Sequence, residues 1–322
     1  MHKLQGPLRI ITFCSITTTL WSGFNPEFLG QAQQPARIAS GQEVRQPQAK
    51  TKEEHKAYVV FYQENDVKNK IDMGNKFLAE FATSELKPNV ILLMIQSAQG
   101  ARDSKVVVDL GEKFLNDFPQ HPSKPFVLQS LMMGSQDLNN FAKTLKYGEM
   151  LLQADPNNLS AFYTIPFILS ERSITADPEG RKQELSRAEE IALQGLNIMR
   201  PEQLNEGPWN QYQASLHSSL GLIHLNNKKY AEAQAEYEKA TAVIKNDPIL
   251  YFRAGLAYSF DKKYQEAIDA LSKSVYLKGI TEIQAKTELE RVYRIKNSVT
   301  STGPELQAAI QRIVDEAGTK LK

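Results

Sequence analysis

The stretch that decides the fold is LGLIHLNNKKYAEAQAEYEKA at residues 220–240, which recurs as AGLAYSFDKKYQEAIDALSKS at residues 254–274. The two copies lie 34 residues apart and align without a gap. Each copy contains two runs with the apolar spacing of a helix, separated by a short polar segment that ends in Lys-Lys. Each copy therefore predicts a pair of consecutive helices, and the fixed period predicts that such pairs are stacked.

Glycine recurs in the first run of each copy, at Gly221 and Gly255. Glycine inside a helix costs roughly 0.5–1 kcal/mol relative to alanine, so its return at a fixed period indicates a packing requirement. Two helices whose axes approach to about 8–10 Å leave room only for small side chains where they cross. We therefore expect both glycines at helix crossings. We expect the bulky Tyr237 and Leu271 to fill the gaps between adjacent hairpins.

The order of small and aromatic residues in these copies matches a known family. The family has a small residue in the first helix, then an alanine, an aromatic residue and a second alanine in the next helix. In the first copy these positions hold Gly221, Ala233, Tyr237 and Ala240, in that order. The second copy departs from this order only at its last two positions, which carry leucine and serine. Residues 214–280 therefore resemble two consecutive tetratricopeptide repeats.

This resemblance implies an all-α fold, an α-solenoid of stacked antiparallel helical hairpins that forms a right-handed superhelix. The first helices of such a solenoid line its concave side, which can hold an extended peptide or a partner's helix. Binding rather than catalysis is the usual activity of this architecture. The resemblance therefore implies a non-enzymatic scaffold whose concave groove binds a peptide or a partner protein.

The N-terminal half contains a fainter repeat with a longer step. GNKFLAEF at residues 74–81 recurs as GEKFLNDF at residues 111–118 and again as GEMLLQ at residues 148–153, each 37 residues further on. We interpret these segments as parts of degenerate hairpins of the same type, with three extra residues in each loop. No stretch alternates apolar and polar residues with period two, so we expect no β-sheet.

The remaining segments complete the solenoid. Residues 159–170 and 187–199 predict another helical pair, separated by a polar insertion at residues 171–184, which brings the total to about six hairpins. Two further helices, at residues 280–296 and 304–321, are expected to cap the last hairpin. The predicted organisation is a signal peptide (1–32), a disordered linker (33–52), degenerate hairpins (53–157), a hairpin with an insertion (158–206), two repeats (207–279) and capping helices (280–322).

The N-terminus has the pattern of a secretory signal. Lys3 and Arg9 form a basic start, and residues 10–24 follow without a charge but are too few to span a bilayer as a helix. Gly-Gln-Ala at residues 30–32 places small residues where a signal peptidase reads them, so we expect cleavage after Ala32 and an exported, periplasmic or extracytoplasmic protein. The alternative is an uncleaved anchor, which would make the chain a membrane-tethered structural component of an envelope assembly.

The charge and cysteine content exclude several classes of protein. The formal net charge is +1, and no long block of basic residues provides the footprint of a nucleic-acid binder. Cys14 is the only cysteine and lies inside the predicted signal, so the mature chain would have neither a thiol nor a disulfide. We therefore expect a protein or peptide partner, no nucleic acid, no cofactor and no membrane span in the mature chain.

Residues able to perform catalysis or to bind metal do not gather in a recognisable pattern. His217 and His224 are two turns apart on one predicted helix, roughly 10.5 Å along its axis, too far to share a zinc ion, so we interpret both as packing residues. Glu53 and Glu54 are adjacent and point in different directions on a helix, so we interpret them as solvent-facing. Nucleophile and phosphate-binding motifs are absent from the sequence, so we expect neither a catalytic site nor a metal site.

The first helices of the two repeats supply the candidate contacts with a partner. Chaperone-binding members of the family use a clamp of Lys, Arg and Asn on this face, and only Arg253 here has that character. The matching positions instead indicate a groove with apolar and hydroxyl groups. Interior packing is the alternative for its two large apolar members, Leu222 and Phe252. The candidate partner-binding residues are Ser218, Leu222, Asn226, Phe252, Arg253 and Ser259.

Overall fold

The computed structural model describes residues 47–173 and 176–321, which form fourteen α-helices and no strand. The predicted signal peptide, its cleavage site and most of the predicted linker lie outside the described residues. The all-α prediction is confirmed. The helices are α1 (Lys52–Gln63), α2 (Val67–Glu80), α3 (Lys87–Gly100), α4 (Ser104–Asp117), α5 (Lys124–Asp137), α6 (Phe141–Ala154), α7 (Leu159–Arg172), α8 (Pro178–Leu196), α9 (Glu206–Asn226), α10 (Tyr230–Val243), α11 (Pro248–Phe260), α12 (Tyr264–Leu277), α13 (Glu282–Asn297) and α14 (Pro304–Leu321).

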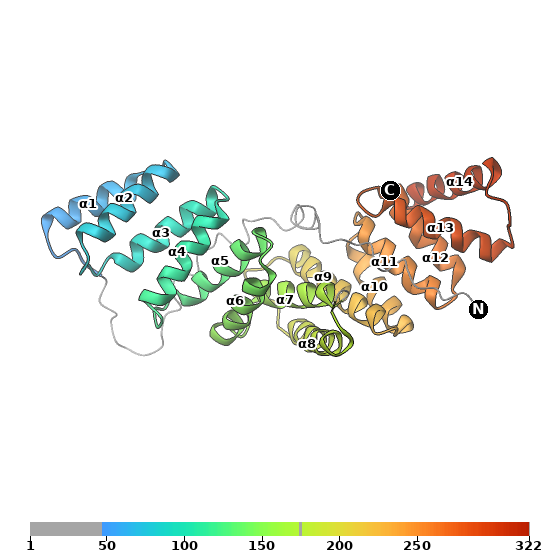
Figure 1. Cartoon of the computed structure of the whole chain (residues 1–322), viewed down its shortest axis with the longest axis horizontal. Coiled ribbons are helices and arrows are strands. Elements are labelled where there is room, and N and C mark those ends of the chain that lie inside the picture. The colour runs from blue at the N-terminus through green and yellow to red at the C-terminus, as the bar shows by residue number, and fades with distance from the viewer. Residues whose placement is uncertain (1–46, 174–175, 322) are drawn as a thin grey trace. The chain divides into compact units, whose positions relative to one another are not determined.

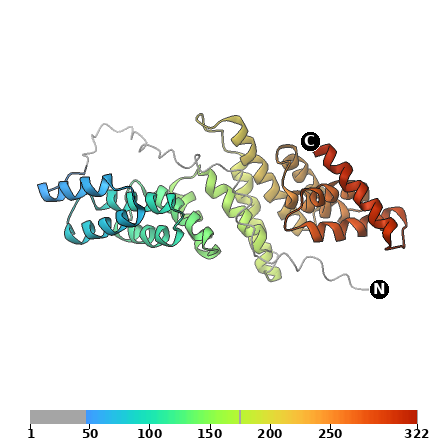
Figure 2. The same cartoon turned by 90° about the horizontal axis from the view of Figure 1, so that it is seen from above.

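The chain divides into two compact units, with the boundary inside α7 after Ala161. In the described part of the chain, the N-terminal unit comprises residues 47–161 and the C-terminal unit comprises residues 162–173 and 176–321. Within each unit the helices follow one another as antiparallel hairpins, and each hairpin packs on the next along the chain (Figure 1; Figure 2 gives the view from above). This arrangement is the predicted stack of helical hairpins.

The repeat of 37 residues in the N-terminal unit also fixes where its second helices begin. Asp66, Asp103 and Asn140 are the N-caps of α2, α4 and α6, and each side chain accepts a hydrogen bond from the backbone N–H three residues later, at 2.9, 3.1 and 3.1 Å. A side-chain oxygen at this position satisfies one of the N–H groups that a helix start leaves without an intrahelical partner. The cap residues therefore belong to the same period as the apolar pattern.

The repeated Lys-Lys of the C-terminal unit forms its tight turns. Lys228 and Lys262 adopt left-handed backbone angles, with φ of 61° and 62°. The next backbone N–H, of Lys229 or Lys263, then donates back to the carbonyl of His224 (2.8 Å) or of the equivalent tyrosine in the second copy (2.9 Å). These bonds satisfy carbonyls at the end of the first helix. The sequence identity between the copies thus encodes one turn conformation, used twice.

The two repeated glycines lie at helix crossings, as predicted. A β-carbon on Gly221 would lie 2.6 Å from Cε1 of Tyr237, and one on Gly255 would lie 2.6 Å from Cγ of Leu271. Each bulky side chain therefore packs against the glycine of its own hairpin, a contact that the sequence did not reveal. Tyr237 also lies in one core cluster with Leu250 of the next hairpin, so the expected packing between hairpins is present too.

The region predicted to be a polar insertion is largely helical. Helix α7 continues to Arg172, and α8 begins at Pro178 rather than at residue 187. Asp177 accepts hydrogen bonds from the backbone N–H groups of residues 179 and 180, at 3.1 and 2.9 Å, and Pro178 occupies the first helical position, where its missing N–H is harmless. The first turns of α8 carry few apolar residues, so the periodic pattern alone did not reveal them.

The start of the first hairpin also differs from its prediction. Glu54 is 2% exposed, so the prediction that both adjacent carboxylates face solvent is wrong for Glu54. Its carboxylate accepts hydrogen bonds from the Lys50 backbone N–H (2.6 Å) and from the Ser84 hydroxyl. These donors hold the pKa of Glu54 below its usual value although burial opposes them. Nζ of Lys50 also donates to the carbonyl of Thr83 at 2.5 Å, so the end of the predicted linker packs against the loop between α2 and α3.

The last two helices cover the final hairpin. Leu271 and Val275 of α12 lie in one core cluster with Leu289 of α13 and with Ile310 and Val314 of α14. The apolar face that a terminal hairpin would otherwise expose is thus buried, as the capping prediction expected. None of the described helices has the length and apolar character needed to cross a membrane.

Candidate partner-binding site

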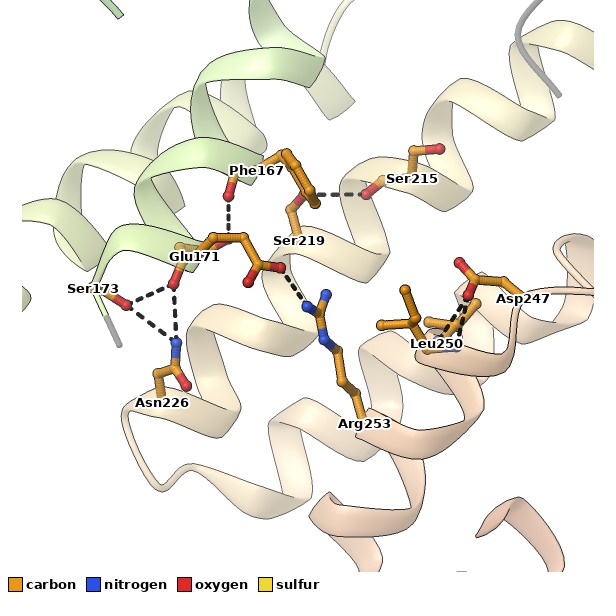
Figure 3. A network of polar contacts seen from close by, with 11 residues as sticks. Phe167, Glu171, Ser173, Ser215, Ser219, Asn226, Asp247, Leu250 and Arg253 are labelled. Carbon is orange, nitrogen blue, oxygen red and sulfur yellow. Dashed lines mark hydrogen bonds and ion pairs between the residues drawn. The ribbon is translucent and has the colours of Figure 1, made fainter. Parts of the chain in front are cut away.

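The first helices of the C-terminal unit are joined by a buried ion pair between Glu171 of α7 and Arg253 of α11 (Figure 3). The guanidinium Nη2 donates to the Glu171 carboxylate, and the two side chains are only 9% and 7% exposed. The partners are 82 residues apart in sequence, with α8 and the whole α9–α10 hairpin between them. The pair therefore links first helices that are not consecutive.

The electrostatic environment keeps the Arg253 guanidinium charged. Burial by itself would lower the pKa of Arg253, but the adjacent Glu171 carboxylate outweighs burial and raises it. The hydroxyl of Tyr237 lies nearby and has no hydrogen-bond partner among the described residues, and burial raises the pKa of that phenol. Tyr237 thus stays neutral. Arg253 is a predicted partner contact because of its positive charge. In the structure the carboxylate of Glu171, in the same chain, balances that charge.

A second contact fastens the end of α7 to α9. The Asn226 side-chain amide donates to the carbonyl of Ser170 (3.2 Å) and to the hydroxyl of Ser173 (3.1 Å), as Figure 3 shows. On the same helix, the Ser219 hydroxyl donates to the carbonyl of Ser215 at 3.3 Å. Asn226 is half-buried and already uses both donors of its amide.

A third polar cluster joins α11 to α13. Ser259 is 4% exposed, and its hydroxyl donates to Oε1 of Glu288 (2.7 Å) and accepts from Nη2 of Arg291 (2.7 Å). Arg291 also donates to Oε1 of Glu288 at 2.6 Å. The three groups satisfy one another, so Ser259 lies inside the packing of this unit rather than on an open surface.

The structure thus places the six candidate partner-binding residues in unequal environments. Leu222 and Phe252 are 3% and 6% exposed, and Phe252 belongs to the core cluster of the last hairpin, which favours interior packing for both. Only Ser218 is half-exposed and has no hydrogen bond from its side chain within the described residues. A role for these residues in binding a partner stays a prediction. The candidate residues that are buried in the core or hydrogen-bonded within the chain are Leu222, Asn226, Phe252, Arg253 and Ser259.

Glu171 is not among the predicted site residues, because it falls in the segment 171–184 that the sequence predicts as a polar insertion. The available signal was charge: residues 159–170 are uncharged, Glu171 ends that run, and Arg253 is the only charged residue within α11. A charged residue within or at the end of an otherwise apolar helix is a candidate for a buried pair. The sequence could not join them, because their separation of 82 residues matches no repeat period.

The histidines of α9 do not form a metal site. Nδ1 of His217 lies 2.5 Å from Oε2 of Glu236 on α10, and Lys239 donates to the other carboxylate oxygen at 2.8 Å. Burial opposes ionisation of Glu236, but these two partners outweigh it and lower its pKa. Across the described residues, no group of three or more histidine, cysteine, aspartate or glutamate side chains could hold a metal ion.

Comparison with known proteins follows the hairpin boundaries. The tetratricopeptide repeat family model matches residues 214–247, which hold the second part of α9 and all of α10, and residues 249–280, which hold most of α11 and all of α12. The C-terminal unit of the chain thus contains two tetratricopeptide repeats. The two matched repeats are those that the sequence comparison of residues 214–280 predicted.

Solved structures with a similar fold include tetratricopeptide repeat proteins. The C-terminal part of such a protein from Cytophaga hutchinsonii is 14% identical, with 84% of this chain and 99% of that chain covered and a TM-score of 0.51. A thermophilic member from Thermus thermophilus is 18% identical (64% and 98% covered, TM-score 0.43), and PilF of Pseudomonas aeruginosa is 13% identical (73% and 90% covered, TM-score 0.49). No curated protein matches the sequence. Identities this low show only the fold.

Proposed function

We propose that this chain is a non-enzymatic scaffold that binds a peptide or a partner protein in the cell envelope. The observation that carries the proposal is the stack of tetratricopeptide hairpins, an architecture whose first helices form an extended binding surface. The polar groups of the candidate site support it. Glu171 is paired with Arg253, and Ser259 is hydrogen-bonded to Glu288, so each of these contacts joins two helices and positions their hairpins. None of these side chains forms an activated nucleophile or an acid–base pair.

The envelope location rests on the sequence of residues 1–32. The basic start, the uncharged run and the small residues before position 33 have the order that a signal peptidase recognises. The equal numbers of acidic and basic residues beyond that point agree with a surface that recognises protein rather than nucleic acid.

The location is tested by the intact mass of the chain after expression with its own N-terminus in a bacterial host that is then fractionated. A mass that begins at Gln33, in the soluble envelope fraction, would support an exported scaffold. A full-length mass in the membrane fraction would favour the alternative, a membrane-tethered component of an envelope assembly. A full-length mass in the cytoplasmic fraction would contradict both proposals.

The scaffold function is tested by crosslinking in intact cells. A lysine-reactive crosslinker reaches the chain readily, because many lysines of the second helices are exposed, among them Lys105 and Lys113 on α4. We expect at least one envelope protein to be captured reproducibly with the tagged chain. The control is the same tag fused to an unrelated exported protein. Equal recovery of every captured protein with that control would argue against a scaffold.

A further inference from the structure

Two isoleucines of the C-terminal unit are exposed where α13 begins. Ile280, in the turn before the helix, is 48% exposed, and Ile283, in its first turn, is 79% exposed. Ile249 lies 34 residues before Ile283, at the same repeat position, and is only 9% exposed. The same position is therefore buried in one copy and accessible in the next, so the exposure of Ile283 is particular to the last repeat.

The turn that carries these isoleucines has a costly backbone conformation. Lys278 has φ 60° and ψ −156°, a region that only glycine enters without strain, and Gly279 follows with φ 98°. The N–H of Lys278 donates to the carbonyl of Val275, and the N–H of Glu282 donates to the carbonyl of Gly279, both at 3.2 Å. Strained residues of this kind persist only where the surrounding structure fixes them, so the two isoleucines are presented by a fixed turn.

The start of α11 and the last turn of α14 lie beside this turn. The ring of Tyr276, at the end of α12, packs on Gly318 of α14, where a β-carbon would collide with it. A β-carbon on Gly279 would lie 3.1 Å from Cγ of Pro248, the first residue of α11. The carbonyl of Pro248 also accepts from the hydroxyl of Ser274 at 2.7 Å. Three stretches of the chain therefore meet at one end of the C-terminal unit.

The exposed charges at this end are mostly positive. Residues 245–248, 276–286 and 316–321 contain four lysines, all exposed, and three acidic residues. Of the acidic residues only Glu316 is exposed, because Asp247 and Glu282 are half-buried at the starts of α11 and α13, where a helix N-terminus favours a carboxylate. We call the accessible lysines and apolar side chains the end face of the C-terminal unit; it consists of Lys245, Tyr276, Lys278, Ile280, Ile283, Lys286 and Lys320.

We propose that the end face of the C-terminal unit binds the surface of an anionic membrane. Exposed isoleucines enter the boundary between lipid headgroups and acyl chains, and tyrosine is favoured at the same depth. The lysines are attracted to anionic headgroups, and their aliphatic stems can lie along the apolar layer while the charges stay in water. Ile283 and Lys286 lie on the same side of α13, since three residues separate them, so one orientation of the helix brings both to the lipid. This contact goes beyond the scaffold function and does not depend on it.

A second copy of the chain or a partner protein fits this face less well. Three partly exposed apolar side chains supply less than the roughly 800 Å² that each partner buries in a stable protein interface. In a symmetric pair of copies the face would meet itself and bring lysines against lysines, which repel. A lipid surface needs neither a large area nor a matching shape, because each inserted apolar side chain contributes by itself.

The test is flotation of the purified full chain with two kinds of vesicle. One contains phosphatidylglycerol and phosphatidylcholine in equal amounts, and the other contains phosphatidylcholine alone. We expect the partition constant to be at least about tenfold higher for the anionic vesicles, because the lysines contribute only there. It should fall about tenfold when the salt is raised from about 0.1 M to about 0.5 M, because salt screens exposed charges.

A variant of the isoleucines locates the site. Ile280→Ser together with Ile283→Ser changes only exposed side chains, so the fold is retained and the partition constant should fall about tenfold. The matched control is Ile295→Ser, at an isoleucine that is 46% exposed near the other end of α13, which should leave the constant within about twofold. Binding through another part of the chain, residues 10–24 included, would be equal in the two variants.

A variant of the lysines tests the charge. Lys278→Gln together with Lys286→Gln should lower the preference for anionic vesicles about fivefold, because two of the four lysines are removed. Lys105→Gln together with Lys182→Gln removes the same charge at exposed positions on α4 and α8 and should leave the preference within about twofold.

Three results would overturn the proposal. The first is equal binding, or none, to the two kinds of vesicle. The second is a partition constant of the double isoleucine variant that equals that of wild type or of Ile295→Ser. The third is self-association of the wild-type chain that the isoleucine variant lacks, without binding to vesicles, which would assign the end face to a second copy. The scaffold function is judged separately by crosslinking in intact cells, so its failure can be told apart from failure of this proposal.

Discussion

Glu171 of α7 and Arg253 of α11 form a buried ion pair that joins two first helices with α9, another first helix, between them in the sequence. In a solenoid each repeat ordinarily contacts only its neighbours, so stability is approximately a sum of repeat and nearest-neighbour contributions. This pair adds a contact that skips one repeat. It therefore couples the unfolding of α7 to that of the two matched repeats, and its removal should affect more than one hairpin.

Replacing Glu171 with glutamine should strongly destabilise the C-terminal unit. The substitution leaves the Arg253 guanidinium buried without its counter-charge, and breaking a buried pair in this way typically costs about 3–5 kcal/mol. The measurement is urea unfolding of the full chain followed by far-ultraviolet circular dichroism. A single amide in place of the carboxylate changes volume very little, so the loss can be attributed to charge.

The double variant Glu171→Leu with Arg253→Met is the control. Exchange of a buried ion pair for apolar side chains of similar size is often neutral or stabilising, so this variant should regain most of the stability that Glu171→Gln loses. A loss below about 1 kcal/mol in the single variant, the size typical of exposed pairs, would show that the ion pair is not buried in solution.

Replacing Gly221 with alanine should destabilise the chain although alanine favours helix formation. The added β-carbon would lie 2.6 Å from the fully buried ring of Tyr237, and forcing extra volume into a packed crossing typically costs about 1–3 kcal/mol. The same unfolding measurement applies. The matched control lies in the same helix: Gly207 has no atom within 4 Å of an added β-carbon, so Gly207→Ala should be neutral or stabilising by up to about 1 kcal/mol. Equal effects of the two substitutions would contradict the crossing at Gly221.

The features that the sequence predicted well are those that recur at a fixed period. Gly221 and Tyr237 could be placed because the same sizes return 34 residues later, and the N-terminal hairpins could be placed because their second helices repeat every 37 residues. A period carries information about packing because each repeat buries the same face against its neighbour. The hairpin count and the capping helices followed from the same argument.

The features that the sequence did not reveal depend on contacts without a period. Glu171 and Arg253 meet across 82 residues, and the buried carboxylate of Glu54 accepts a hydrogen bond from Ser84, in the loop between α2 and α3. The tertiary contacts of a charged side chain decide whether it is buried, and a local sequence pattern does not identify those contacts. For the same reason, candidate contacts chosen by repeat position, such as Phe252, proved to be mostly interior.

The stability of the N-terminal unit should depend on pH through Glu112. Its carboxylate accepts hydrogen bonds from Lys143 (2.6 Å) and from the hydroxyl of Tyr147 (2.5 Å), and these lower its pKa, the lysine most strongly, although partial burial opposes them. A carboxyl with a lowered pKa in the folded chain stabilises it above the unfolded value of about 4.3, and this contribution is lost as the pH falls through the folded value. Glu112→Gln should therefore be less stable than wild type at pH 7.

Urea unfolding of both chains at several pH values between about 7 and 3 checks this expectation. The difference in stability between Glu112→Gln and wild type should shrink steadily below about pH 4.3. Lys143→Met removes the strongest hydrogen-bond donor to the carboxylate, so the pH dependence of this variant should be shallower than that of wild type. A difference that stays constant over the whole range would mean that Glu112 has no lowered pKa.

The start of α8 should depend on the side chain of Asp177. Its Oδ1 accepts from the backbone N–H groups of Glu179 (3.1 Å) and Gly180 (2.9 Å), and loss of such a cap typically costs about 1 kcal/mol. In Asp177→Ala, hydrogen–deuterium exchange of the amides in the first turn of α8 should therefore be about fivefold faster, since about 1.4 kcal/mol corresponds to tenfold. Asp177→Asn keeps a side-chain oxygen that can accept both bonds, so its exchange should stay close to wild type. Unchanged exchange in Asp177→Ala would mean that the helix begins further along the chain, nearer to residue 187, where the apolar pattern of the sequence first becomes regular.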